Sequence, residues 1–187
     1  MTTPLWAPWR MEYISGTARV AHKQKPSRCF MCDHPADEAG LRENLVLLVQ
    51  EHAFVCLNRY PFASSHLMVI PRRHVAKPYD LEAVEYAALM ELLRESVARL
   101  ERTVSCDGMN VGFNLGKAAG AGVADHLHGH IVPRWDGDTN FMPVLAGVHV
   151  MPEYLDDAWR RLYPAFADLP GLRAPAPAPA ATAGPTT

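Results

Sequence analysis

One short segment, His126-Leu127-His128-Gly129-His130, constrains the fold more than any other part of the chain, because every second residue is a histidine. Side chains alternate across a β-strand, so this spacing predicts a strand with three imidazoles on one face, about 7 Å between successive members. Leu127, Gly129 and Ile131 then point to the other face, and the strand ends at Pro133. A glycine-rich run, residues 116–122, directly precedes it.

Three interpretations fit such a row of imidazoles. Isolated histidines are usually surface or packing residues, but three in alternation after a glycine-rich loop argue against that. A metal bound by all three needs converging side chains, as in a catalytic zinc site, whereas one strand spaces them in a row. A neutral imidazole can attack phosphorus with one ring nitrogen. Its other nitrogen then donates a hydrogen bond to a neighbouring acceptor, which fixes the tautomer. We favour this last interpretation, in which one of the three imidazoles is the nucleophile.

The rest of the pattern predicts an α+β domain with an antiparallel sheet of about five strands and two main helices. Short apolar runs at residues 45–49, 53–58 and 66–70 predict a meander of three strands. Residues 108–114 alternate and predict a further strand, with one apolar face formed by Met109, Val111 and Phe113.

Two segments carry helical signals. From Asp80, a plausible N-cap, apolar residues recur three or four positions apart, at Leu89, Leu93, Val97, Leu100 and Val104. The second predicted helix runs from about Pro152 towards Tyr163. The glycine-rich run between strands permits close backbone approach to phosphates, which agrees with chemistry on phosphorus.

Length and charge narrow the class of protein. The 187 residues suit one domain, with 49% hydrophobic and 20% charged residues, as in ordinary globular proteins. A formal net charge of −2 gives no broad basic field for nucleic acid, and no apolar stretch is long enough to span a membrane. We therefore expect a cytoplasmic protein with neither nucleic acid nor membrane as a partner.

The ends of the chain differ in composition from its middle. Residues 1–28 are rich in aromatic residues and proline, and we expect them to pack on the domain or on a partner subunit. Residues 29–168 form the predicted catalytic domain. Residues 169–187 are mostly proline, alanine, threonine and glycine, which predicts a disordered tail.

The histidine segment resembles the signature of the histidine triad (HIT) family, His-x-His-x-His followed by two apolar residues, which residues 126–132 match. Residues 58–71 resemble the strand–turn–strand that cradles ribose and base in that family. Asn114, Leu115 and Gly116, with Ala119 and Gly120, resemble its phosphate loop. Residues 5–10 and 133–141 further resemble the branch that includes bacterial diadenosine tetraphosphate phosphorylases.

The resemblance implies a role for each matching residue. His128 would become nucleotidylated, with His126 and His130 in support, while Asn58 would contact the ribose and Asn114 the phosphate. The implied nucleotide-binding residues are Asn58, His66, Asn114, Gly120, Ala121, Gly122 and Trp135. Two residues depart from the family pattern: Ser65 precedes His66 where glycine is usual, and Gly122 replaces a side-chain phosphate donor. A homodimer or larger homo-oligomer is also implied.

Cys29 and Cys32 form a C-x-x-C pair without the strand and following helix of a thioredoxin-like site, which favours zinc over redox chemistry. Two thiolates need two more ligands to complete a structural tetrahedron. In zinc-bearing members of the family these are a histidine after the proline of the third strand and the first histidine of the triad, here His74 and His126. His22 and His34 are rival ligands, and a reduced pair without metal is the other alternative.

Together these features predict a nucleotidyl transferase or hydrolase that acts on dinucleoside polyphosphates through a covalent nucleotidyl-histidine, with adenine nucleotides as the expected substrates and structural zinc as the expected cofactor. A dinucleoside polyphosphate hydrolase or a nucleoside phosphoramidase is the alternative among enzymes, since members with those activities share the three histidines. A non-catalytic nucleotide-binding module is the alternative from another class.

Overall fold

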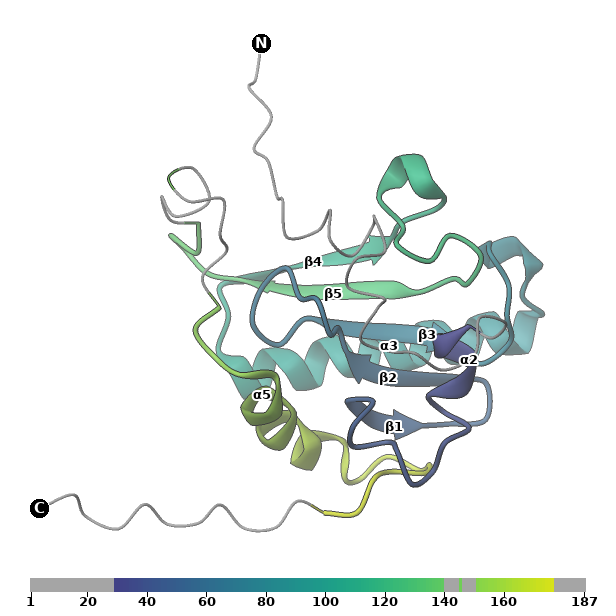
Figure 1. Ribbon diagram of the computed structural model, residues 1–187, viewed down its shortest axis with the longest axis horizontal. Coiled ribbons are helices and arrows are strands. Elements are labelled where there is room, and N and C mark those ends of the chain that lie inside the picture. Colours follow the sequence, from purple (N-terminus) through teal and green to yellow (C-terminus); the bar gives the residue numbers. More distant parts are fainter. Residues whose placement is uncertain (1–28, 140–144, 146–150, 177–187) are drawn as a thin grey trace, which may run out of the picture.

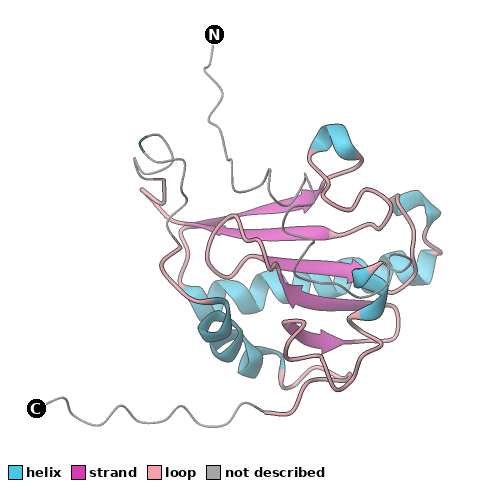
Figure 2. Ribbon diagram, viewed as in Figure 1, coloured by secondary structure: helices cyan, strands magenta, loops and turns pink. Residues whose placement is uncertain are grey.

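The computed structural model describes residues 29–139, 145 and 151–176. Its centre is one antiparallel sheet of five strands in the order β1-β2-β3-β5-β4, which confirms the predicted fold class (Figure 2). The strands are β1 (Val46–Val49), β2 (Ala53–Leu57), β3 (Leu67–Pro71), β4 (Gly108–Phe113) and β5 (Gly129–Arg134). β5 therefore lies between β3 and β4, and its neighbours on both sides frame the histidine segment.

The first three strands form the predicted meander, and every residue in them is buried. Their sequences are continuous apolar runs, which is the pattern expected when both faces of a strand are covered. One face packs against the long helix α3 (Ala83–Val104), which lies across the sheet in Figure 1. The core thus sits between α3 and the sheet.

The helix α3 begins two residues later than predicted. Asp80 belongs instead to a short 3-10 helix, η2 (Pro78–Asp80), and the N-cap is Glu82, which forms a capping box with Glu85. A glutamate can fill this role because the two side chains each accept from the other's backbone N–H, so both exposed donors are satisfied. Four leucines form the buried centre of the helix: Leu89, Leu92, Leu93 and Leu100.

Strand β4 forms one edge of the sheet and is its most exposed strand. Met109 and Phe113 pack against the core as predicted, but Val111 between them is 45% exposed. The predicted apolar face is therefore incomplete. Residues at a sheet edge are covered only where the helix behind them reaches, so alternation alone did not determine the burial of Val111.

The C-terminal part of the described chain closes the other edge of the sheet. Helix α5 (Leu155–Leu162) continues into η4 (Tyr163–Phe166), and the indole N–H of Trp159 donates to the carbonyl of Val46 at 3.0 Å. Leu172 and Val49 exchange two backbone hydrogen bonds of 2.8 Å. Because Ala174 is also buried, the packed domain extends past the predicted boundary at residue 169. Backbone hydrogen bonds to β1, and one from the Tyr163 hydroxyl to the carbonyl of Ala174, hold this segment on the domain despite its low-complexity composition.

Two predictions concern residues outside the described ranges. The N-terminal extension, residues 1–28, lies outside them, as do residues 177–187 of the predicted tail. Within the described ranges, no helix combines the length and the apolar character needed to cross a lipid bilayer.

Candidate active site

The histidine segment is not one continuous strand. His126 and His128 precede β5, which begins at Gly129, and only His130 lies within it. The backbone N–H of Leu127 donates to the carbonyl of Val75 at 2.6 Å, so the start of the segment is tied to the loop after β3. The prediction that one strand carries all three histidines was therefore wrong at its start. This bond, made outside the sheet, lets His126 take different partners from the other two histidines.

His128 is 5% exposed, and its Nδ1 lies 2.8 Å from the backbone carbonyl of His126. A carbonyl only accepts, so Nδ1 carries the proton and Nε2 keeps its lone pair. Burial lowers the pKa of His128, against the opposing effect of the hydrogen bond to the carbonyl. The ring is therefore held neutral, in the tautomer that leaves Nε2 as the nucleophilic atom.

His130 belongs to a chain of three bonded groups. The backbone N–H of Phe62 donates to His66 Nδ1 at 3.1 Å, so the proton of neutral His66 lies on Nε2. That Nε2 lies 3.0 Å from His130 Nδ1, which must accept. Neutral His130 then carries its own proton on Nε2. The ring centroids of His128 and His130 are 4.9 Å apart, so His130 presents an N–H donor beside the ring of His128.

The loop between β2 and β3 holds His66 from several sides. The ring of Phe62 stacks on the imidazole with centroids 5.1 Å apart, and Asn58 Nδ2 lies 3.4 Å from His66 Nδ1. The carbonyl oxygen of the Asn58 side chain accepts from the backbone N–H of Tyr60 at 3.0 Å. Asn58, predicted to contact a ribose, is thus engaged in shaping the loop around His66.

The glycine-rich loop turns twice through the left-handed region, at Gly116 (φ 91°) and Gly120 (φ 86°), on either side of the 3-10 turn η3 (Lys117–Ala119). The backbone N–H groups of Gly120 and Ala121 donate within the loop, to the carbonyls of Lys117 and Gly116. These two N–H groups, predicted to bind phosphate, are therefore used to close the loop itself. The sequence does not show which backbone N–H groups of the loop bond within it and which could reach a ligand.

Asn114 and Trp135 lie at opposite ends of the β4–β5 pair. Phe113 pairs with Gly129, so Asn114, one residue further, is level with His128. Trp135 follows the last residue of β5 and lies five residues beyond His130, which is about 16 Å along an extended strand. Its indole N–H donates to the carbonyl of Ser105 at 3.3 Å. Within one chain Asn114 lies at the histidines, and Trp135 does not.

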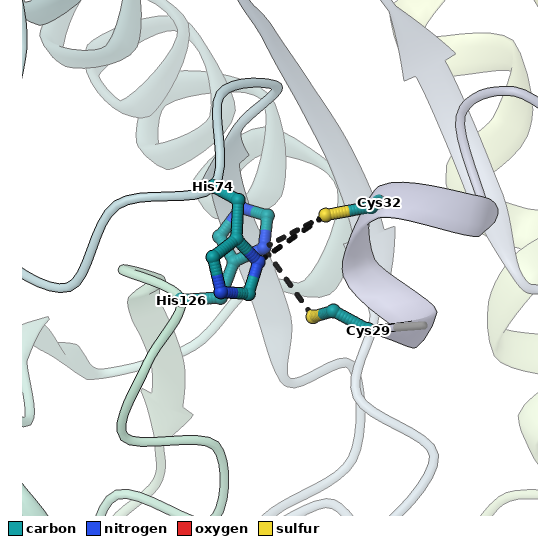
Figure 3. A group of neighbouring side chains, drawn as sticks. All are labelled: Cys29, Cys32, His74 and His126. Atoms are coloured by element: carbon teal, nitrogen blue, oxygen red, sulfur yellow. Dashed lines mark hydrogen bonds between the residues drawn. The ribbon is translucent and has the colours of Figure 1, made fainter. Parts of the chain in front are cut away.

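Four predicted metal ligands come together in space. The ligand atoms of Cys29, Cys32, His74 and His126 all lie within 4.8 Å of one another. In Figure 3 the two sulfurs, from the start of the short helix α2 (Phe30–Asp33), face the paired rings of His74 and His126. The Nδ1 atom of His126 lies 3.4 Å and 3.5 Å from the two sulfurs, and His74 Nδ1 lies 3.3 Å from Cys32. His34 packs on Phe30 instead, and His22 lies outside the described residues.

This cluster fits a tetrahedral metal. With metal–sulfur bonds of about 2.3 Å and metal–nitrogen bonds of about 2.0 Å, neighbouring ligand atoms of a tetrahedron are about 3.5 Å apart. His126 Nε2 lies 2.8 Å from the carbonyl of Pro71, so its proton is on Nε2 and its Nδ1 lone pair faces the sulfurs. Burial also lowers the pKa of His126, which favours the neutral form that ligates.

Sequence reasoning missed the two partners of His66. Phe62 stacks on its ring and donates its backbone N–H, and His130 accepts from its Nε2. Phe62 lies in an irregular loop, where no periodicity predicts which way a side chain points. His66 and His130 are 64 residues apart, and only the pairing of Met68 with His130 across β3 and β5 brings them together.

Comparison with known proteins finds both a matching family model and a relative that is similar over most of the chain. The family model described as the HIT domain matches residues 41–137, which span β1 to the end of β5. The chain is 37% identical over 169 residues to the "AP-4-A phosphorylase" of Mycobacterium tuberculosis (strain ATCC 25618 / H37Rv), covering 89% of this chain and 85% of that protein.

Two solved structures share the fold. A histidine triad nucleotide-binding protein from Sulfolobus tokodaii strain7 has a TM-score of 0.61 and 25% identity, with 75% of this chain and 93% of that one covered. A Zn-bound histidine triad family protein from Mycobacterium smegmatis has a TM-score of 0.59 and 24% identity, with 74% and 93% covered.

Proposed function

Because this chain belongs to the HIT domain family, we propose that it is a nucleotide-processing enzyme that transfers a nucleoside monophosphate by way of a covalent bond to His128. One observation carries the proposal most directly. The Nδ1 proton of His128 is directed at the His126 carbonyl, so Nε2 of a buried, neutral ring is left as a nucleophile.

The first half of the proposed reaction is attack of His128 Nε2 on the α-phosphorus of a dinucleoside polyphosphate. A nitrogen–phosphorus bond forms, the bond from that phosphorus to the bridging oxygen breaks, and the remaining nucleotide leaves as an anion. The Nε2 proton of His130, beside the nucleophile, is a donor suited to negative charge on the non-bridging phosphate oxygens. Asn114, level with His128, is the second candidate contact for the phosphate.

In the second half, an oxygen of the acceptor attacks the same phosphorus and the nitrogen–phosphorus bond breaks, which returns His128 to its neutral form. We propose inorganic phosphate as the acceptor. The support is the similarity over 89% of this chain to a protein named AP-4-A phosphorylase. The three histidines determine the covalent intermediate, whereas the acceptor depends on groups around them.

The nucleophile is tested by His128→Ala, with His52→Ala as the control because His52 lies on the turn between β1 and β2 and belongs neither to the triad nor to the Cys/His cluster. We expect the His128 variant to lose activity on diadenosine tetraphosphate by at least about a thousandfold, since a nucleophile has no substitute in this mechanism. It should also form no nucleotidylated protein after an acid-free quench and mass spectrometry. Undiminished turnover in His128→Ala would reject the proposal.

The acceptor is tested by incubating the enzyme with diadenosine tetraphosphate with and without inorganic phosphate. ADP and ATP formed only when phosphate is present support the phosphorylase. AMP and ATP formed in either case indicate a hydrolase, and turnover of an AMP-amine alone indicates a phosphoramidase. Nucleotide binding without any turnover or covalent adduct indicates a binding module.

We further propose that the four-residue Cys/His cluster holds zinc in a structural role. Two thiolates and two imidazoles are a ligand set that zinc favours, and four protein ligands fill a tetrahedron without leaving an open catalytic position. Bound there, the metal would add a link between α2, the loop after β3 and the first histidine of the triad. His126 then acts as a ligand, and His128 and His130 remain for chemistry.

A further inference from the structure

Ser65, the residue before His66, has a backbone conformation that serine rarely adopts. Its φ is 61°, in the left-handed region, where a side chain beyond glycine meets the backbone and costs about 1 kcal/mol. Ser65 is 3% exposed, and His66, which follows it, is 1% exposed. The direction in which the chain enters His66 therefore depends on groups that hold Ser65 in this conformation.

Two charged side chains from the C-terminal part of the domain reach this loop. Arg161, in α5, donates from Nη2 to Ser65 Oγ at 2.8 Å. Glu153, just before α5, accepts from Ser64 Oγ at 2.6 Å, and also accepts from Arg161 at 3.0 Å and 2.6 Å. The four side chains form one closed network, in which the two serines are held by an ion pair that is itself bidentate.

Arg160 provides an internal comparison. It is the preceding residue of the same helix and also makes a carboxylate pair, with Asp156 at 2.7 Å. That pair lies within α5, where its two residues are four apart, and Asp156 also pairs with Arg42. The pair of Glu153 and Arg161 differs because its atoms also bind the loop that precedes His66.

We propose that Arg161 and Glu153 are positioning residues for the active site: they hold Ser65 in its left-handed conformation and thereby aim His66 at His130. The route is short, because Ser65 precedes His66 in the chain and His66 Nε2 is 3.0 Å from His130 Nδ1. The inference rests on the proposed function, in which His130 supplies the N–H beside the nucleophile. The helix α5 would thus affect catalysis through Arg161, although none of its residues takes part in the chemical step.

The test uses Arg161→Met, which keeps the length of the side chain and removes its donors, beside Arg160→Met as the matched control. We expect kcat on diadenosine tetraphosphate to fall about tenfold in Arg161→Met with KM nearly unchanged, because a small misalignment of a catalytic group affects the chemical step most. The imidazole nitrogen signals of His66 and His130 in ¹⁵N NMR should shift in this variant. Arg160→Met should leave both the kinetics and these signals as in the wild type.

The backbone conformation is tested by repeating Arg161→Met in a Ser65→Gly background. Glycine adopts a φ of 61° without strain, so the loss of Arg161 should then change kcat less than about twofold relative to Ser65→Gly alone. A loss of similar size in both backgrounds would contradict the proposal, as would equal behaviour of Arg161→Met and Arg160→Met. If Arg161→Met does not fold, Glu153→Gln serves in its place in the same comparisons.

The two proposals fail in different ways. If the wild-type protein turns over no dinucleoside polyphosphate, the proposed function fails, but the nitrogen signals of His66 and His130 still decide whether Arg161 positions them. If the wild type is active and its His66 and His130 signals do not respond to Arg161→Met, the positioning role is wrong and the proposed function stands.

Discussion

Two histidines that are two residues apart in the chain hold their protons on different nitrogens. His128 donates from Nδ1 to the carbonyl of His126, whereas His126 donates from Nε2 to the carbonyl of Pro71. The remaining lone pair is therefore on Nε2 in the first ring and on Nδ1 in the second. Backbone carbonyls thus divide the triad into a candidate nucleophile and a candidate metal ligand, without any difference in residue type.

The metal site is tested by Cys29→Ser, with Cys106→Ser as the control because Cys106 is partly buried and lies outside the cluster. We expect elemental analysis to find about one zinc per chain in the wild type, in Cys106→Ser and in His128→Ala, and much less in Cys29→Ser. Thermal unfolding of Cys29→Ser should occur at a lower temperature, since binding of a structural metal adds to folding stability. Loss of zinc in His128→Ala would instead indicate that the triad itself binds the metal.

At the scale of elements, strand β5 packs against the helix α3 and also carries His130 of the candidate site. Gly129 lies between the two histidines proposed for chemistry, and a Cβ built on it would be 3.0 Å from both Leu93 Cδ1 and the ring of Phe113. The side of β5 opposite the imidazoles is therefore in close contact with α3. A glycine at this position lets the helix approach the strand that carries His130.

We predict that Gly129→Val destabilises the protein by about 1–3 kcal/mol, because an overpacked core must shift side chains or backbone. The control is Gly112→Val in the neighbouring strand β4, where a Cβ would meet nothing within 4 Å. Its effect on the free energy of unfolding should stay within about 0.5 kcal/mol, as for most exposed sites. Urea unfolding of both variants measures the difference. Equal stabilities would show that α3 does not pack on Gly129 as described.

At the scale of the whole molecule, charged pairs link loop residues to the helix or strand beside them. Asp168 is bonded to Arg99 of α3, and Glu85 to Arg73 in the loop after β3. Asp138 accepts from Arg134 at 2.5 Å and 2.8 Å and from the backbone N–H of Trp135. Hydrogen bonds from the arginines lower the pKa of all three carboxyl groups.

A lowered pKa makes stability depend on pH with a definite sign. A carboxylate whose pKa is lower in the folded than in the unfolded state stabilises the fold above its unfolded pKa, about 3.9 for Asp and 4.3 for Glu, and loses that effect as the pH falls towards the folded pKa. The melting temperature of the wild type should therefore fall as the solution is acidified below about pH 4.

We predict that Asp138→Asn lowers the melting temperature by about 2–4 °C at pH 7, a shift that corresponds to one effective ion pair in a chain of this size. The difference from the wild type should shrink as the pH falls below about 4, because the unfolded wild type then binds a proton on Asp138 that Arg134 disfavours in the folded state. Glu51→Gln is the control, since Glu51 is 87% exposed. A difference that persists unchanged at pH 2 would mean that Asp138 acts by packing and not by charge.

Much of this protein is determined by local sequence. Continuous apolar runs marked β1, β2 and β3, leucine periodicity marked α3, and alternate spacing marked the three histidines as a candidate site, because each pattern depends on side chains a few residues apart. The C-x-x-C pair also indicated a metal site by its spacing alone. The resemblance to the family then supplied His74 and His126, which the structure brings within 4.8 Å of the two cysteines.

The tertiary structure decided what depends on contacts between distant parts of the chain. It separated His126 from His128 and His130, joined His66 to His130 across the sheet, and directed Gly120 and Ala121 into their own loop. It also placed Arg161 against Ser65, 96 residues away. A hydrogen bond depends on the position and direction of both partners, and a local pattern specifies only one of them.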